Sequence, residues 1–198
     1  MLQSPTVVIG SMLGAAAVGP FALSQQLLSV ANLLLNVTMT PLWPAYGEAA
    51  ARHDIIWIKR TFVRSVWVSF LLVGATSIMV TLLGRTVIQF WTGRPEIVPS
   101  ISLLTACSVW AAVGAWSRAC FMLLNGLGRM TAQAIYGILL PLITMALSFH
   151  FGRAIGAAGV VWIAVIFGET LRGVFAGAEV FLVFRTFDRI VTCACQES

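Results

Sequence analysis

Long uncharged stretches separated by short polar segments dominate the hydrophobic pattern of this chain. Five of these stretches are close to the length that a helix needs to cross a bilayer, about 20 residues. We predict membrane-spanning helices over residues 21–42, 65–84, 101–124, 131–149 and 157–184. Residues 1–13 are equally apolar but would cover only about 20 Å as a helix, against about 30 Å of hydrocarbon. We therefore interpret them as the end of a truncated first helix.

Glycines and prolines mark the predicted boundaries between these helices. Residues 14–20 form a predicted first turn, with Gly19 and Pro20 as helix breakers. A loop is expected over residues 85–99, a tight turn over residues 125–129 and another turn over residues 153–156. These connections are short enough for neighbouring spans to pack side by side as a helical bundle.

Residues 21–42 carry no charge, yet their polar side chains recur at three- and four-residue spacing. Gln25, Ser29, Asn32 and Asn36 therefore share one face of the predicted helix. An amide that faces lipid would lack hydrogen-bond partners, so this face should turn toward other helices or toward water. We predict that these residues line a substrate cavity. The alternative is that they make hydrogen bonds between packed helices.

Two prolines, Pro41 and Pro44, end this span. Trp43 and Tyr46 are placed to lie at the level of the lipid headgroups, as an interface anchor and a hinge. Residues 45–60 then form a predicted short interfacial helix with a basic end.

Three charged residues, Arg118, Glu169 and Arg172, lie inside predicted spans, where charge is costly unless it faces a wet interior. We predict that they line the cavity, together with Asn125, which shares the face of Arg118. Glu169 and Arg172 are three residues apart and can neutralise each other on one helix. Three alternatives stay open: an ion pair that locks two helices together, a proton on Glu169 that drives transport, and snorkelling of Arg118 to the headgroups.

Composition confirms the class that the pattern predicts. Of the 198 residues, 59% are hydrophobic and 10% are charged, and the mean hydropathy is +0.94, which is typical of an all-α integral membrane protein. The net charge of +5 does not indicate a nucleic-acid-binding protein, because most arginines lie where predicted spans end. The cysteines and histidines lack the spacing of a metal site, and no catalytic motif or cofactor signature is present, so we expect no enzyme.

Charge asymmetry predicts the orientation in the membrane. If the spans alternate in direction, seven basic residues lie on one side and three on the other. The larger group comprises Arg52, Lys59, Arg60, Arg64, Arg129, Arg185 and Arg189, and the smaller one Arg85, Arg94 and Arg153. The larger group is expected in the cytoplasm, together with a disordered C-terminal tail over residues 188–198. Five spans plus a remnant with both ends inside are expected of one lobe, residues 1–187, of a two-lobe transporter.

Three segments of the chain resemble one family: VVIGSMLGAAAVGPFALSQQLLSVANLLL, PLWPAYGEA and MLLNGLGRMTAQ. They are similar to the C-terminal lobe of Wzx-type oligosaccharide flippases, which are polysaccharide biosynthesis proteins of the multidrug/oligosaccharidyl-lipid/polysaccharide exporter superfamily. The resemblance covers nearly all of residues 7–187, and PLWPAYGEA is its most specific part.

The resemblance implies a carrier of the bacterial inner membrane that moves undecaprenyl-pyrophosphate-linked oligosaccharide to the outer leaflet for surface polysaccharides such as the O-antigen of lipopolysaccharide. It also implies alternating access between two lobes around a cationic cavity. The implied partners are lipid-linked oligosaccharide, membrane lipids, a missing N-terminal lobe, a polysaccharide polymerase and glycosyltransferases. Two alternatives stay open, an ion-coupled multidrug exporter of the same superfamily and a non-transporting membrane scaffold subunit.

Overall fold

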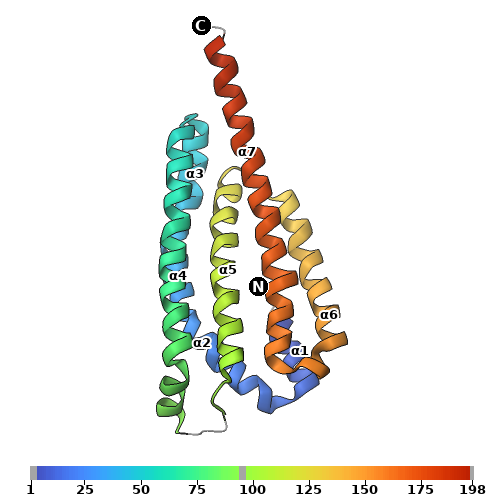
Figure 1. The fold of residues 1–198 in the computed structure, drawn as a ribbon. Helices are drawn as coiled ribbons and strands as arrows, with labels where there is room; N and C mark the ends of the chain where they lie inside the picture. Colours follow the sequence, from blue (N-terminus) through green and yellow to red (C-terminus); the bar gives the residue numbers. More distant parts are fainter. Residues whose placement is uncertain (1–3, 94–96, 197–198) are drawn as a thin grey trace.

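A computed structural model describes residues 4–93 and 97–196 of the chain, and in these residues the fold is an all-α bundle (Figure 1). In chain order the helices are α1 (Ser4–Leu13), α2 (Ala15–Met39), α3 (Leu42–Ala51), α4 (Ile55–Thr92), α5 (Ile101–Gly126), α6 (Thr131–Ile163), the π-helical segment η2 (Ala164–Thr170) and α7 (Leu171–Gln196). Five stretches are long and apolar enough to cross a membrane: Ala17–Ala51, Ile55–Thr92, Ile101–Gly126, Thr131–Gly152 and Ala154–Phe187. The prediction of an all-α, multi-pass membrane bundle is confirmed.

Successive long helices run in opposite directions, as the short connections predict. In Figure 1 α2, α5 and α7 rise toward the end of the bundle that carries α3, the α5–α6 turn and the C-terminus, and α4 and α6 descend from it. The segments at this end contain Arg52, which follows α3, Lys59, in the first turns of α4, and Arg129, in the α5–α6 turn. Arg94 lies outside the described residues. We name the end with α3 and the C-terminus the upper end.

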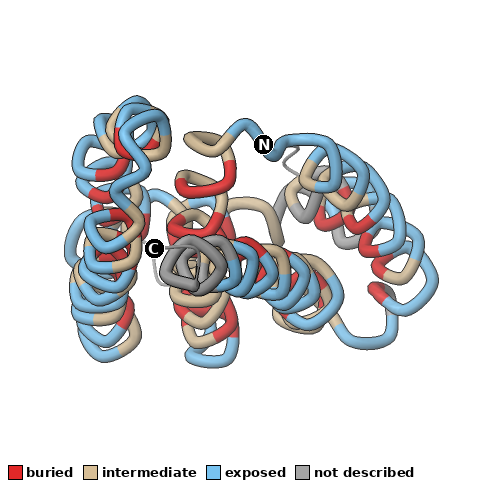
Figure 2. Tube along the Cα trace, turned by 90° about the horizontal axis from the view of Figure 1, so that it is seen from above, coloured by how far each residue is buried: buried red, intermediate tan, exposed pale blue. Residues whose placement is uncertain are grey.

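Helix α5 occupies the centre of the bundle. It contacts α2, α3, α4, α6 and α7, and half of its most apolar stretch is buried, against 22–28% in the other four spans. Figure 2, which looks down the bundle, shows the buried positions turned toward the spaces between helices and the exposed positions on the outer surfaces. The residues that α5 presents to its neighbours therefore decide what the interior of the bundle contains.

The bundle is apolar outside and carries small polar residues inside, the reverse of a soluble protein. On α4, Ser69 and Ser77 are buried, whereas Leu82 and Phe90 are 72% and 93% exposed. The Ser77 hydroxyl donates to the Ser108 carbonyl of α5, and the Ser108 hydroxyl donates back to the Ser77 carbonyl, each over 3.2 Å. Small residues let helices approach closely, and such hydrogen bonds hold them together where no hydrophobic effect separates protein from lipid tails.

The first predicted turn differs from the structure. Only Gly14 leaves the helical conformation, with φ 81°, and α2 begins at Ala15. Pro20 lies inside α2, close enough to its start that the missing backbone donor disturbs few helical hydrogen bonds. The helix predicted over residues 21–42 thus begins six residues earlier in the structure, at Ala15.

The predicted interfacial helix over residues 45–60 also differs. Helix α3 ends at Ala51, and the Asp54 side chain accepts a hydrogen bond from the Trp57 backbone N–H over 3.0 Å, which caps the start of α4. Residues 55–60 are therefore the first turns of a 38-residue helix. Aspartate is a strong N-cap, and this signal separates the two helices.

The last two spans meet at a backbone break at Gly156, which has φ 69° and ψ −175°, within the turn predicted over residues 153–156. After it, the chain rises again through η2 and α7 (Figure 1). Residues 188–196, predicted to be disordered, instead continue α7 up to Gln196. Helical hydrogen bonding carries on here because no proline or glycine interrupts it.

A single added methyl group at Gly126 should destabilise the bundle. A Cβ at this position would lie 2.5 Å from the Cβ of Tyr46 and 2.8 Å from the Trp43 carbonyl oxygen, so α3 would have to move away from α5. We expect Gly126→Ala to cost about 1–3 kcal/mol of unfolding free energy, measured as a lower thermal midpoint in detergent. The matched control is Gly74→Ala on α4, where nothing lies within 4 Å of the added Cβ. The control should be neutral or stabilising by up to about 1 kcal/mol, and equal midpoints for the two variants would contradict the expected clash.

Candidate functional site

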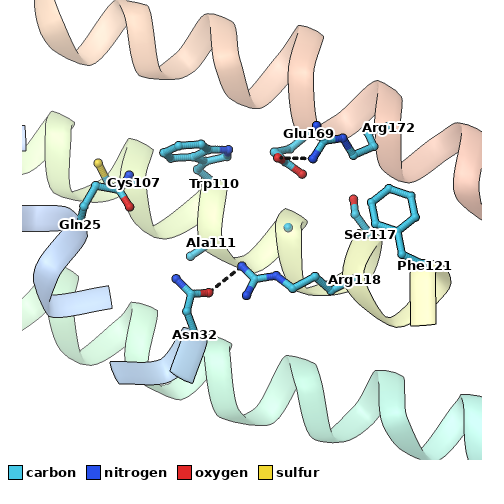
Figure 3. Close-up of a pocket in the computed structure, with 11 residues that line it drawn as sticks. Gln25, Asn32, Cys107, Trp110, Ala111, Ser117, Arg118, Phe121, Glu169 and Arg172 are labelled. Carbon is cyan, nitrogen blue, oxygen red and sulfur yellow. Dashed lines mark hydrogen bonds and ion pairs between the residues drawn. The ribbon is translucent and has the colours of Figure 1, made fainter. Parts of the chain in front are cut away.

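A polar cleft lies between α2, α5 and the rod formed by η2 and α7 (Figure 3). It offers about 110 Å³ to water-sized molecules, which is room for several waters. Its lining residues are Gln25 and Asn32 of α2; Cys107, Trp110, Ala111, Gly114, Ser117, Arg118 and Phe121 of α5; and Glu169 and Arg172 of η2 and α7. We call this site the α5 cleft.

The α5 cleft exists because one face of α5 is small. Its residues recur at three- and four-residue spacing from Cys107 to Phe121, which places them along one side of the helix. Ala111, Gly114 and Ser117 form the middle of this side and leave room above the backbone. The long polar side chains of the flanking helices therefore reach inward over α5 rather than outward into lipid (Figure 3).

Arg118 is held by α2. Its Nη2 donates a hydrogen bond to Oδ1 of Asn32 over 2.6 Å (Figure 3). The guanidinium is also attracted electrostatically by Glu169 across the cleft. Arg118 thus points into the bundle, and the geometry disfavours the alternative in which it snorkels to the headgroups.

Glu169 and Arg172 form an ion pair on the opposite wall of the cleft. Arg172 Nη1 lies 3.2 Å from Glu169 Oε1, and the two side chains are only 15% and 13% exposed. The Arg172 guanidinium also lies over the Phe121 ring, 5.9 Å from its centroid. Both members of the pair belong to one continuous rod, so the pair does not lock two helices together.

The backbone under this ion pair is π-helical. Segment η2 runs over Ala164–Thr170, and the Thr170 hydroxyl donates to the Val165 carbonyl five residues earlier over 2.8 Å. A π-helical turn inserts one extra residue and changes which way the following side chains point, and such turns are frequent at functional sites. It therefore sets the direction in which Glu169 and Arg172 enter the cleft.

Gly114 separates the two charged walls. A Cβ added there would lie 3.8 Å from Arg118 Nη2 and 3.8 Å from Glu169 Oε2. These are ordinary van der Waals distances, so a methyl group at position 114 would touch both the arginine and the carboxylate without displacing either. Any larger residue at position 114 would fill it.

The cleft has more hydrogen-bond donors than acceptors. Gln25 Nε2, Arg118 Nε and Arg172 Nε are buried and have no hydrogen-bond partner in the described residues. All three atoms carry N–H groups. The lining also contains two arginines against one carboxylate. A buried donor without a partner is costly, so the site fits waters or a ligand that is rich in acceptors and negatively charged.

The structure brings together five of the eight side chains that the sequence predicts for a cavity: Gln25, Asn32, Arg118, Glu169 and Arg172. The other three do not line it. Ser29 is exposed and donates to the Gln26 carbonyl of its own helix over 2.6 Å. Asn36 is exposed one turn beyond Asn32, and Asn125 is half-buried near the end of α5. Helices α2 and α5 both pass the cleft, but these three residues do not line it.

Of the four residues predicted to lie at the membrane interface, three are exposed and one is buried. Pro41, Trp43 and Pro44 are exposed, as an anchor at the membrane surface would require. Tyr46 differs, because its side chain is completely buried and meets the Trp57 ring edge-to-face at 6.0 Å. Tyr46 lies on α3 and packs against the end of α5, so it is a packing residue rather than a headgroup anchor.

Sequence reasoning missed Trp110, Gly114, Ser117 and Phe121 as lining residues. Gly114 and Phe121 lie four and three residues from Arg118, so helical spacing from Arg118 would have found these two. Trp110 and Ser117 do not follow from that spacing. Ser108 and Ala115 lie ten and three residues before Arg118, and they are buried against other neighbours. The π-helical turn has no comparable signal in the sequence.

No family model matches the chain, and no curated protein or solved structure is significantly similar to it. The resemblance to Wzx-type flippases therefore stays a prediction from the quoted segments. Across residues 4–93 and 97–196, no group of three or more His, Cys, Asp or Glu side chains is arranged to hold a metal ion.

Removing the carboxylate of the cleft should destabilise the protein more than removing an exposed one. Glu169→Gln keeps the side-chain shape but leaves Arg118 and Arg172 without the negative charge that they share. A buried charge without its partner is strongly destabilising, although water in the cleft can reduce the cost. We therefore expect the free energy of unfolding to fall by about 2–3 kcal/mol, measured by thermal unfolding.

The control for this prediction is Glu48→Gln, which removes the exposed pair with Arg52, 3.9 Å apart, and should leave the midpoint unchanged. The double variant Glu169→Gln/Arg118→Gln should recover part of the loss, because it removes one of the two uncompensated charges. A double variant that is less stable than Glu169→Gln would show that charge imbalance is not the cause.

Proposed function

We propose that this chain forms one lobe of a membrane carrier that moves a lipid-linked oligosaccharide, joined to its lipid through pyrophosphate, across the membrane. The single observation that carries the proposal is the α5 cleft, with its net positive lining and its unpaired N–H donors. Pyrophosphate offers many acceptor oxygens and negative charge, and arginine binds it with several charge-assisted hydrogen bonds.

The contacts within the cleft suggest how an anion would bind. Arg118 is held by the neutral amide of Asn32, and Arg172 by the carboxylate of Glu169. A phosphate group is a stronger partner for a guanidinium than a neutral amide oxygen is. An anion would therefore displace Asn32 from Arg118, and this exchange would loosen the connection between α2 and α5. Binding would thereby be coupled to a change in helix packing.

The outer surface of the bundle supports the same proposal. Large hydrophobic side chains cover it, including Leu71, Leu82, Phe90, Ile138 and Phe181, all more than half exposed. A polyprenyl chain can stay in the surrounding lipid while only the polar headgroup enters the protein. A second lobe would complete the cavity wall opposite α5. We place the carrier in the bacterial inner membrane with the basic upper end in the cytoplasm, working with a polysaccharide polymerase and glycosyltransferases.

The two alternatives make different demands on the cleft. A multidrug exporter for cationic compounds needs an acidic or aromatic cavity, and the two arginines of this cleft would repel a cation. A scaffold subunit needs no charged residues that face inward. Because charge inside a membrane bundle is costly, the charges in the cleft argue against a scaffold. The positive cleft therefore favours an anionic substrate.

Loss of either arginine should stop glycan export in cells. With Arg118→Gln or Arg172→Gln introduced at the chromosomal gene of the source organism, we expect at least a tenfold reduction of surface polysaccharide and accumulation of its lipid-linked precursor. The measurements are gel analysis of the surface glycan and of extracted lipid-linked oligosaccharide. Arg52→Gln, which alters an exposed arginine, is the matched control. Normal export with normal protein levels in both cleft variants would refute the proposed function, and raised sensitivity to cationic drugs instead would favour the exporter.

Filling the cleft should block export without removing any charge. Gly114→Leu would place a branched side chain between Arg118 and Glu169, whereas Gly114→Ala adds only a methyl group at 3.8 Å from both. We expect the leucine variant to lose export in the same assay and the alanine variant to keep most of it, with both proteins present in the membrane. Equal activity of the two variants would show that the space at Gly114 is not used by the substrate.

A further inference from the structure

A second polar cluster lies between α6 and α7, next to the α5 cleft. Gln133 Oε1, Tyr136 OH and Glu179 Oε2 are all buried, and none has a hydrogen-bond partner among the residues that the structure describes. We call these three residues the α6–α7 cluster. None of them was a candidate from the sequence, and none lines the cleft.

The members of this cluster lie on two antiparallel helices that meet at Tyr136. Tyr136 of α6 stacks on Phe175 of α7, with ring centroids 6.1 Å apart and planes inclined by 20°. One turn above this pair lie Gln133 on the descending α6 and Glu179 on the rising α7. Glu179 interacts electrostatically with Tyr136 and with Arg129 at the upper end. The three unpaired oxygens therefore belong to one short segment of the α6–α7 contact.

The cluster adjoins the cleft through aromatic rings. Phe121, which lines the cleft under Arg172, stacks on the other face of Tyr136 at 6.1 Å and 22°. Tyr136 also interacts electrostatically with Arg172. Arg172 and Glu179 are seven residues apart on α7, or about 10 Å along the helix. A ligand held by Arg172 could therefore extend along α7 to the cluster.

The chemistry of the cluster differs from that of the cleft. Its unpaired atoms are an amide oxygen and a carboxylate oxygen, which accept, and a phenol hydroxyl, which can donate or accept, whereas the unpaired atoms of the cleft are all N–H donors. A phosphate would be repelled by Glu179. A metal ion would need more oxygen ligands than one carboxylate and one amide supply. A sugar ring presents hydroxyl groups that both donate and accept, which match the two acceptor oxygens and the phenol hydroxyl of this segment.

We infer that Gln133, Tyr136 and Glu179 form a saccharide-binding extension of the α5 cleft, which takes the sugar ring next to the phosphate at Arg172. This inference rests on the proposed function and adds to it where the sugar binds. In the closed α6–α7 contact the three oxygens lack partners, which costs free energy. Entry of a sugar between the helices supplies these partners and separates α6 from α7 at the upper end.

The inference can be tested on the purified full chain in an uncharged, sugar-free detergent. The probes are the 1-phosphates of glucose, galactose, mannose and N-acetylglucosamine, with inorganic phosphate and the four methyl glycosides for comparison. Saturation-transfer NMR titrations give the dissociation constants. We expect at least one sugar phosphate to bind about three- to tenfold more tightly than inorganic phosphate, the gain expected for one or two additional hydrogen bonds.

The variants separate the sugar from the phosphate. Tyr136→Phe keeps the stacked ring and Glu179→Gln keeps the side-chain shape, so the fold should persist, as the thermal midpoint will show. Both should bind the sugar phosphate no more tightly than inorganic phosphate, with phosphate binding unchanged. Arg172→Gln should weaken both ligands. Glu48→Gln, which alters an exposed residue, should change neither.

If the proposed function holds, two results would overturn the inference. One is that wild-type protein binds every sugar phosphate no more tightly than inorganic phosphate, which would mean that waters alone satisfy the cluster. The other is a sugar preference that Tyr136→Phe and Glu179→Gln leave unchanged. Failure of the proposed function would give a different result. If the cleft does not bind the phosphate group, inorganic phosphate would bind Arg172→Gln as tightly as it binds the wild-type protein. In that case binding of methyl glycosides that depends on Tyr136 would still support the sugar site, and its absence would reject it.

Discussion

A polar group in the hydrocarbon of a bilayer has no water to bind, and this constraint organises the whole structure. Helices satisfy their own backbone groups, but amides, hydroxyls and charges on side chains need partners from other helices or from enclosed water. The bundle meets this requirement around α5. Ser77 and Ser108 satisfy each other at its contact with α4, and Asn32 satisfies Arg118 at its contact with α2. Hydrogen bonds donated by side chains thus join the central helix to its neighbours.

The same constraint makes the unsatisfied groups informative. Three N–H donors in the α5 cleft and three oxygens in the α6–α7 cluster are buried without partners in the described part of the chain. Two of the donors belong to arginines, whereas the oxygens belong to a glutamine, a tyrosine and a glutamate. The cleft therefore needs an acceptor, and the cluster needs hydroxyl groups that can donate as well as accept. One ligand with an acceptor-rich, anionic end and a hydroxyl-rich end would satisfy both. Phosphate-linked sugars have this composition, which is why the cleft and the cluster support one substrate class.

Two irregular backbone segments, the break at Gly156 and the π-helical turn η2, position the polar groups of the cleft and the cluster. The π-helical turn η2 precedes Arg172 and contains Glu169, and the break at Gly156 lets the last rod return beside α5 and α6. Without the extra residue of the π turn, the side chains that follow would point in different directions around α7. Since the positions of Arg172, Phe175 and Glu179 depend on this turn, a change in its winding would move the cleft wall and the cluster together. A carrier that alternates between two states needs such a connected element.

The sequence by itself determined the class of the protein. Runs of uncharged residues allow only membrane helices, and glycines and prolines lie close to most of the turns, so the number of spans and their alternating directions followed from the pattern. It also identified Gln25, Asn32, Arg118, Glu169 and Arg172 as inward-facing, because a polar residue in a membrane helix has few other places to go. Only the tertiary structure decided which of the polar residues meet. Ser29 and Asn36 share a helix face with Asn32 within the tolerance of a helical count, but a rotation of a fraction of a turn leaves them outside the cleft. The burial of Tyr46 and the α6–α7 cluster depend on contacts between distant segments, which local spacing does not encode.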